Sequence, residues 1–254
     1  MDAIAAAGLN PFFITVENVP AGLGFKLFGA QHLLWLAATV AIAVALGLWY
    51  RRATEKQRSA LRYTFAALLI ADELFKIVCL CIMGQYMPKY LPLHLCSINI
   101  FIIAAYAVKQ SDALKNFLYL VCTAGALMAL LFPAWTALPA TSFMYWHSFS
   151  VHLLLVAFPL ILTIGGEIHP DVRALPKAFL VLGGFAVVAL IVNLIWGTNF
   201  MFLMYAEPGN PLYFFQQAFG SHLIGFPVLI AALVAVFMGP WYIADKVKAK
   251  RAAA

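Results

Sequence analysis

Seven stretches of this sequence are apolar over almost their whole length, and they restrict the possible folds more than any other feature. A helix needs roughly 20 largely apolar residues to cross about 30 Å of hydrocarbon. Hydrophobic residues make up 65% of the chain and charged residues 10%, a composition that excludes an ordinary soluble domain. The seven stretches lie at residues 31–50, 62–84, 92–108, 115–132, 147–165, 177–197 and 221–243.

These stretches are continuously apolar. The strands of a closed β-barrel, the other fold that satisfies its backbone in lipid, would alternate apolar and polar residues. No internal repeat and no long linker divides the chain. The sequence therefore predicts an all-α polytopic membrane protein, a bundle of seven transmembrane helices that forms a single domain over residues 1–254.

The distribution of basic residues predicts the orientation of the bundle. Of the 16 Lys and Arg residues, all except Lys26, Lys76 and Lys89 lie in the first, third and fifth connectors or in the C-terminal tail. Basic residues are enriched on the cytoplasmic side, so we expect the N-terminus outside and the C-terminus in the cytoplasm. The net charge of +6 then reflects topology and attraction to anionic lipid headgroups, and no nucleic-acid partner is inferred from it.

On this topology, nearly all polar and ionisable residues inside the predicted helices fall in the outer half of the membrane, and the cytoplasmic half is nearly all apolar. Ionisable groups are costly in hydrocarbon unless they pair or line a wet cavity, so their convergence predicts a functional site that opens to the outer side. The set comprises His32, Asp72, Glu73, Lys76, His94, Cys96, His147, His152, Asn193 and His222.

Asp72 and Lys76 are four residues apart on the second predicted helix, a spacing that favours an ion pair between them. Glu73 points about 100° away from Asp72 and lacks such a partner, which makes it the better candidate for function. Asn193 and Asn199 are typical of amides that bond between membrane helices. The candidates for substrate binding are Gln31, Asp72, Glu73, Lys76, Asn99 and Asn199.

Cys96 is the candidate nucleophile. Pro92 is typical of a first helical turn, so Cys96 is expected near the positive end of a helix dipole, where a nearby imidazole further favours the thiolate. The competing interpretation is a buried cysteine that only packs. His94 reaches Cys96 only if the segment is irregular, because residues two apart do not face each other on a helix. The candidate bases are His94, His32, His152 and His222.

Three sequence motifs carry a family resemblance. They are Phe28-Gly29-Ala30-Gln31-His32, Leu91-Pro92-Leu93-His94-Leu95-Cys96-Ser97 and Gly197-Thr198-Asn199-Phe200-Met201-Phe202-Leu203. In this order they resemble the YwaF-like family of bacterial integral membrane proteins, which is similar, more distantly, to a eukaryotic transmembrane acyltransferase of ether phospholipids. The resemblance implies a multi-pass protein of the bacterial inner membrane and acyl transfer through a cysteine acyl-enzyme, for which Cys96 is the matching position.

The resulting hypothesis is an acyltransferase that acts on phospholipid or lysophospholipid from the outer side, with membrane lipids as its partners and phospholipid as acyl donor. Cys96 attacks the acyl ester, a histidine moves the proton, Asn99 or a helix N-terminus stabilises the oxyanion, and Lys76 holds the headgroup. No cofactor is assigned to this chemistry.

Three alternatives remain open. The first is a transporter of protons or a small polar solute, with Glu73, His32 and His222 as a relay; the apolar cytoplasmic half disfavours it. The second is a metal-dependent membrane lipid hydrolase, although the chain lacks HxxH, HExxH or HxxxH spacing and we assign no metal ligand. The third, a seven-helix receptor or assembly partner, needs no catalysis.

Overall fold

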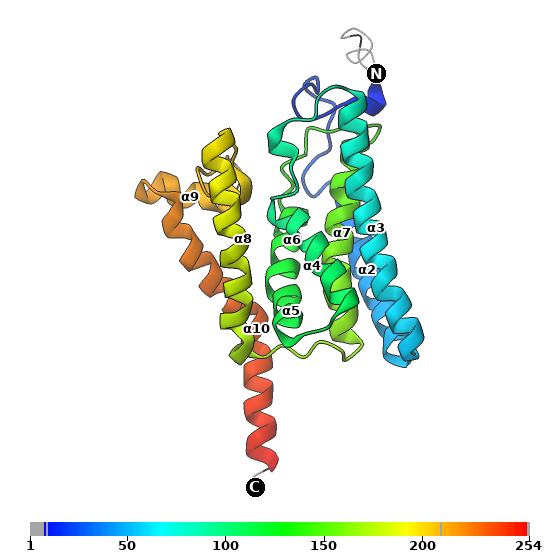
Figure 1. Ribbon diagram of the computed structural model, residues 1–254, viewed down its shortest axis with the longest axis vertical. Coiled ribbons are helices and arrows are strands. Elements are labelled where there is room, and N and C mark those ends of the chain that lie inside the picture. The colour runs from blue at the N-terminus through cyan, green and yellow to red at the C-terminus, as the bar shows by residue number, and fades with distance from the viewer. Residues whose placement is uncertain (1–7, 9, 209, 253–254) are drawn as a thin grey trace.

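The computed structural model describes residue 8 and residues 10–208 and 210–252, and within these ranges it contains helices and no strand. The long helices run roughly parallel or antiparallel, with the two termini at opposite ends of the molecule (Figure 1). They are α2 (Ala30–Arg52), α3 (Glu55–Ile82), α4 (Leu95–Val108), α5 (Asp112–Asn116), α6 (Thr123–Leu131), α7 (Phe143–Ile164), α8 (Leu175–Trp196), α9 (Pro211–Phe219) and α10 (Gly225–Ala252).

Short irregular helices join these elements. Between α5 and α6 the chain continues as a π-helix, η3, in which the Thr123 hydroxyl donates to the Leu118 carbonyl five residues earlier, at 3.1 Å. Helical structure therefore lies at all seven expected ranges. The 3₁₀ turns are η1 (Pro11–Phe13), η2 (Pro88–Tyr90), η4 (Val172–Ala174), η5 (Phe200–Phe202) and η6 (His222–Ile224).

Five helices of the described chain are long and apolar enough to cross a membrane: Ala30–Arg52, Asp112–Leu131, Phe143–Ile164, Val172–Trp196 and His222–Ala252. The other two expected spans differ from these five. The apolar α4 has only 14 residues, about 21 Å, and α3 carries charged residues at its start and along its middle. Two structural corrections follow from α4 and α9. The third predicted helix, α4, begins at Leu95 and not at Pro92, and α9 is a helix that was not predicted from the sequence.

The helices form two groups. The α2–α7 group surrounds the central helix α7, and α8, α9 and α10 lie to one side of it (Figure 1). The helix α2 packs very closely on α7, because a Cβ at Gly47 would lie 2.7 Å from the Ile164 side chain. Tyr119 of η3 joins the groups: its hydroxyl donates to the Phe237 carbonyl at 3.2 Å and accepts from the Trp241 indole at 2.9 Å.

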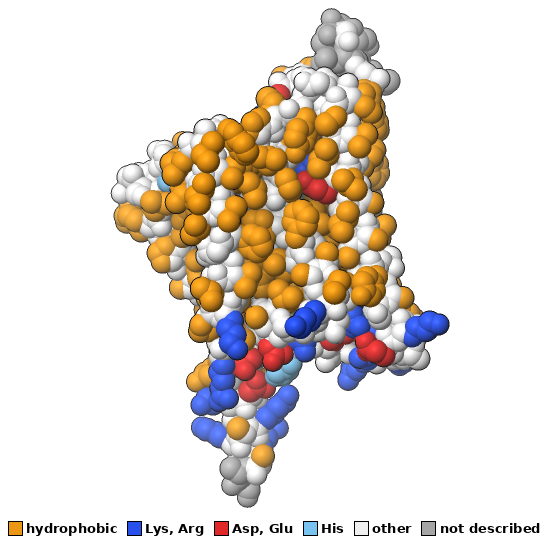
Figure 2. Space-filling view, in the orientation of Figure 1, with side chains coloured by type: hydrophobic (Ala, Val, Ile, Leu, Met, Phe, Trp, Pro, Cys, Tyr) orange, Lys and Arg blue, Asp and Glu red, His pale blue; other side chains and the backbone are white. Residues whose placement is uncertain are grey.

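Charge is segregated along the molecule. Figure 2 shows hydrophobic side chains over most of one face, with Lys and Arg gathered at the end that carries the C-terminus. A small patch of acidic and basic side chains also lies within the hydrophobic band. The four cysteines are free thiols, and Cys79 and Cys122 are buried. The segregation is that of a multi-pass membrane protein, with one charged end and a polar cluster inside the apolar band.

Candidate functional site

The charged residues of the apolar band lie on α3. The Lys76 ammonium donates to the Glu73 carboxylate at 2.6 Å, and both side chains are more than nine-tenths buried. The expected pairing of Lys76 with Asp72 is therefore wrong. Residues three apart also face each other on a helix, and Asp72 is turned toward α7 instead.

Asp72 meets His147 and Ser150 of α7. The Asp72 Oδ2 atom lies 3.0 Å from His147 Nδ1, and the Ser150 hydroxyl donates to Asp72 Oδ1 at 3.2 Å. His147 Nε2 lies 4.0 Å from Glu73 Oε2, so the ring sits between two carboxylates. Neither Asp72 Oδ2 nor His147 Nδ1 completes an aligned hydrogen bond within the described chain. Asp72, Glu73, Lys76 and His147 are called the outer cluster below.

Cys96 is the second residue of α4, and His94 is its N-cap residue in an extended conformation. The irregular segment that the His94 hypothesis needed is therefore present. No side chain caps the first turn, so its backbone N–H groups and the positive end of the helix dipole lie beside the thiol. The His94 ring packs edge-on against Phe200 with centroids 4.9 Å apart, and no hydrogen bond joins it to Cys96 among the described residues.

A common depth relates Cys96 to the outer cluster. Arg62 of α3 and Tyr106 of α4 both bond to Glu167, so the two helices share a reference level. At 1.5 Å per residue, Glu73 lies about 16 Å above Arg62, and Cys96 lies about 15 Å above Tyr106. Glu73 and Cys96 therefore occupy the same layer.

His152 of α7 lies in a similar layer, about 18 Å from the inner end of its helix at Ile164. Its Nδ1 atom lies 2.6 Å from the Ser148 carbonyl oxygen, which only accepts, so Nδ1 carries the proton. The neutral ring then has its lone pair on Nε2. The ring stacks on Trp135 with centroids 4.9 Å apart, which fixes its plane.

Asn99 follows Cys96 by three residues and therefore shares its face of α4. Its side chain is buried, with 1% of its surface exposed, yet neither the amide nitrogen nor the amide oxygen has a hydrogen-bond partner in the described part of the chain. Buried amides are normally bonded, so this one has unused capacity to donate and to accept.

Three predicted site residues lie elsewhere or are already fully bonded. His32 is completely buried; its Nδ1 accepts from the Phe28 N–H at 2.9 Å, so its Nε2 carries the proton and donates to the Leu130 carbonyl at 2.6 Å. Gln31 is exposed. His222 lies in η6 and packs with α9 and α10, away from the outer cluster.

The Gly197–Leu203 motif folds onto its own backbone. Asn199 is half-buried; its amide oxygen accepts from the Met204 N–H at 3.1 Å, and its nitrogen donates to the Tyr205 carbonyl. Asn193 accepts from the Phe200 N–H at 2.7 Å and donates to the Phe200 carbonyl at 3.1 Å. The motif thus holds Phe200 against His94, and neither amide bonds between two distant helices as the sequence suggested.

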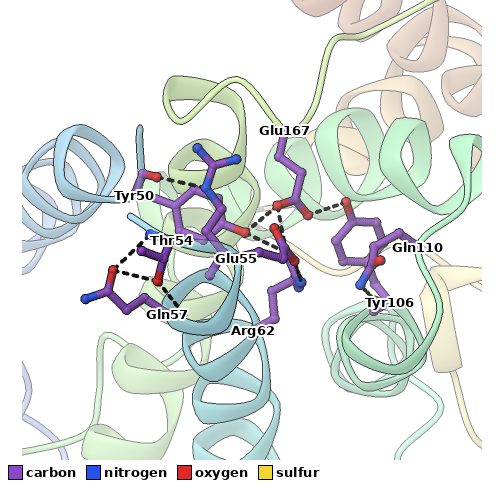
Figure 3. Close-up of polar contacts among 9 residues, drawn as sticks. Tyr50, Thr54, Glu55, Gln57, Arg62, Tyr106, Gln110 and Glu167 are labelled. Carbon is purple, nitrogen blue, oxygen red and sulfur yellow. Dashed lines mark hydrogen bonds and ion pairs between the residues drawn. The ribbon is translucent and has the colours of Figure 1, made fainter. Parts of the chain in front are cut away.

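A second buried network lies at the opposite end of the bundle (Figure 3). Arg62 donates to Glu167 at 2.8 Å, to the Tyr50 hydroxyl at 2.9 Å and to Glu55 at 2.5 Å. The Tyr50 and Tyr106 hydroxyls also donate to Glu167. The expectation that this half is nearly all apolar is wrong. In the sequence, Arg62 is recognisable only as a topology signal, and Glu167 carries no local motif.

Among the residues that the structure describes, no group of three or more His, Cys, Asp or Glu side chains is arranged to hold a metal ion. In comparisons with known proteins, the family model described as the TMEM164 family, a transmembrane protein family, matches residues 27–243. No curated protein and no solved structure matches the chain.

Proposed function

Since the chain belongs to the TMEM164 family of transmembrane proteins, we propose that it is a membrane-embedded acyltransferase that acts on phospholipids or lysophospholipids through a thioester on Cys96. The observation that carries the proposal is the Cys96 face of α4. A thiol beside an uncapped helix N-terminus shares that face with a buried amide that has no partner among the described residues. The resemblance to the eukaryotic ether-phospholipid acyltransferase implies the same reaction, acyl transfer through a cysteine.

The proposal includes the topology. All seven helical segments cross a bacterial inner membrane, with the N-terminus outside and the C-terminus in the cytoplasm. The short α4 and the charged α3 are accommodated because they lie within the bundle, where α3 packs on α4 and α7. Ionisable residues in membrane helices are tolerated when they face other helices.

In the first half-reaction, the Cys96 sulfur attacks the ester carbonyl carbon of a phospholipid. The bond between that carbon and the glycerol oxygen breaks, and the lysophospholipid leaves as an alcohol. The proton that Cys96 gives up passes to the leaving oxygen through His152, whose Nε2 lone pair is available. The Asn99 amide and the first-turn N–H groups of α4 stabilise the oxyanion.

In the second half-reaction, His152 accepts the proton of an acceptor lysophospholipid hydroxyl. The hydroxyl oxygen attacks the thioester carbon, the carbon–sulfur bond breaks, and His152 returns the proton to the thiolate. Lys76 and its partners on α3 bind the polar headgroup. A phospholipid donor fits an outer site, because acyl-CoA is cytosolic.

The transporter alternative is less well supported. It needs polar groups that reach from one face to the other, but fully buried apolar side chains separate the outer cluster from the Arg62 network. Leu69 of α3, Ile103 of α4 and Phe158 of α7 are each 0% exposed within this layer. Proton or solute flux in proteoliposomes, with no thioester, would favour transport over acyl transfer.

The first experiment is intact-mass spectrometry of the protein supplied with phospholipid, with and without hydroxylamine. Wild type is expected to carry a fatty-acyl adduct that hydroxylamine removes, and Cys96→Ser is expected to lack it. The matched control is Cys122→Ser, because this neighbouring thiol is buried and already donates to the Leu155 carbonyl at 3.4 Å. It should keep the adduct. An adduct that hydroxylamine still removes from Cys96→Ser would contradict the proposal.

A second measurement separates the histidines. His152→Ala is expected to slow thioester formation roughly 10²- to 10⁴-fold, the usual range for a general base. His94→Ala removes only the contact with Phe200 and is expected to have a smaller effect. If His94→Ala proves the more damaging change at equal folding, His94 is the base.

A further inference from the structure

A groove of about 670 Å³ lies on the membrane-facing side of α2 and α3, in the half of the bundle that carries the Arg62 network. Its α3 wall runs from Gln57 to Leu68, about 16 Å along the helix axis. Its floor is Leu153 and Leu154 of α7. The α2 wall consists of Ile42, Leu46 and Trp49.

Helix packing explains why the groove is open. The helix α2 packs on α7, and α3 packs on α4 and α7, but α2 and α3 make little contact with each other along their length. The two polar side chains in the α3 wall are already bonded locally. Thr64 donates to the Ala60 carbonyl at 2.9 Å, and the Gln57 side chain accepts from Thr54 in the capping box. The groove is therefore largely apolar, and the Thr64 hydroxyl and the Gln57 amide oxygen on its α3 wall are bonded within α3 and its cap.

The lower end of the groove is basic. Arg52 follows Trp49 by three residues and Lys56 precedes Ala60 by four, so each lies on the face that lines the groove and extends it toward the connector. Both are exposed and have no ion pair within the described chain. The only acidic residue of this connector, Glu55, is paired with Arg62 at 2.5 Å. The rim thus carries uncompensated positive charge.

We propose that this groove is a binding site for an anionic phospholipid of the cytoplasmic leaflet. One acyl chain lies between α2 and α3, and the phosphate headgroup contacts Arg52 and Lys56. The apolar length and the basic rim lie in the order in which a phospholipid presents its chain and its phosphate. Basic residues at the membrane surface attract anionic lipid in the same way. The site is separate from Cys96, so lipid binding in the groove does not depend on acyl transfer. Only the assignment of the lipid to the cytoplasmic leaflet rests on the proposed orientation.

The test uses native mass spectrometry of the delipidated full chain with added phosphatidylglycerol or phosphatidylcholine of the same acyl composition. Wild type is expected to retain phosphatidylglycerol more tightly. The double variant Arg52→Ala with Lys56→Ala should weaken phosphatidylglycerol binding roughly tenfold or more and leave phosphatidylcholine unchanged. Ala60→Trp, which fills the groove at an exposed position, should remove one bound molecule of either lipid.

Matched controls make the outcome decisive. Lys248→Ala with Lys250→Ala removes the same charge from the exposed tail, and Ala41→Trp adds the same bulk to an exposed position of α2 outside the groove. Neither is expected to change lipid retention. An equal loss of phosphatidylglycerol binding in the Arg52→Ala, Lys56→Ala variant and in the Lys248→Ala, Lys250→Ala control would show general attraction to a basic surface. Unchanged retention in Ala60→Trp would show that the groove is not the site, and either result overturns the proposal.

Discussion

The outer cluster and the Arg62 network both contain buried ion pairs, but they differ in how completely their carboxylates are bonded. Within the Arg62 network, the buried nitrogen without a partner among the described residues is Arg62 Nε. Both carboxylate oxygens of Glu167 are bonded, to Arg62, Tyr50 and Tyr106. In the outer layer, Asn99 has no partner among the described residues, and the close pair of Asp72 and His147 is misaligned.

This difference separates a structural role from a functional one. The Arg62 network ties α2, α3, α4 and the end of α7 together, and each carboxylate oxygen of Glu167 already accepts at least one hydrogen bond within it. A buried polar group without a partner lowers stability, so its presence in the outer layer is better explained by a ligand that completes it. The comparison predicts that similar substitutions change the free energy of unfolding in opposite directions, depending on whether the replaced polar group is bonded.

The largest effect is expected from Arg62→Met. The substitution leaves the Glu167 carboxylate buried without its cation, and breaking one partner of a buried ion pair costs about 3–5 kcal/mol. Reversible unfolding in detergent measures the loss. Lys56→Met, an exposed change on the same helix, should stay within about 0.5 kcal/mol. Adding Glu167→Gln to Arg62→Met should recover part of the loss; if it recovers nothing, the pair is not what stabilises this end.

The next test compares two buried asparagines. Asn99→Leu removes an unpartnered amide and should raise the free energy of unfolding by about 1 kcal/mol or more, while slowing acyl transfer by roughly 10²-fold. Asn116→Leu should lower the free energy by about 1–3 kcal/mol, because Asn116 donates to the Asp112 carbonyl and accepts from the Asp171 N–H, both at 2.9 Å. If Asn99→Leu also lowered the free energy of unfolding, the contrast between bonded and unbonded buried amides would be wrong.

Much of the fold could be predicted from hydropathy, since it reports which segments avoid water. It placed helical structure at all seven ranges. It could not predict that α4 begins only at Leu95, because the segment before it stays irregular as far as the N-cap residue His94. It also could not predict the π-helix at Phe117–Cys122, which is accompanied by a bond from the Thr123 hydroxyl to the Leu118 carbonyl.

The candidate site was predictable as a layer but not as a set of contacts. Depth along each helix follows from residue number, so Glu73, Cys96 and His152 could be grouped. The rotation of a helix about its axis depends on packing, which the sequence does not show. For that reason the predicted partner of Lys76 was wrong, and His147 was not among the predicted site residues. Its signal was present: His147 and Asp72 are both in the outer polar set.

A smaller effect is expected from His32→Phe. His32 resembles Glu167 in having all the polar atoms of its side chain bonded, although the sequence made it a candidate base. The substitution should lower the free energy of unfolding by about 1–2 kcal/mol, because the Phe28 N–H and the Leu130 carbonyl lose their partner. Thioester formation by the folded fraction should be unchanged. A specific loss of acylation without loss of stability would return His32 to the site.

The smallest effect is expected at Glu17, where a fully bonded ion pair is exposed to solvent instead of buried. Burial raises the pKa of the Glu17 carboxyl, but hydrogen bonds from Lys89 and Tyr90 outweigh this and lower the pKa from 4.5 to about 2. A lowered folded-state pKa stabilises the protein above the unfolded value, and this contribution is lost as the pH falls from 4.5 toward 2. The Glu17 side chain is 36% exposed and that of Lys89 45%, so solvent screening limits the contribution to below about 1 kcal/mol.

The free energies of unfolding of wild type and Glu17→Gln should therefore differ slightly at pH 6 and converge only as the pH falls to about 2. A difference that is independent of pH would show that packing of the loop, and not the charge of Glu17, stabilises this segment. A difference as large as that of Arg62→Met would contradict the comparison itself, because it would mean that burial does not decide what a bonded ion pair contributes in this protein.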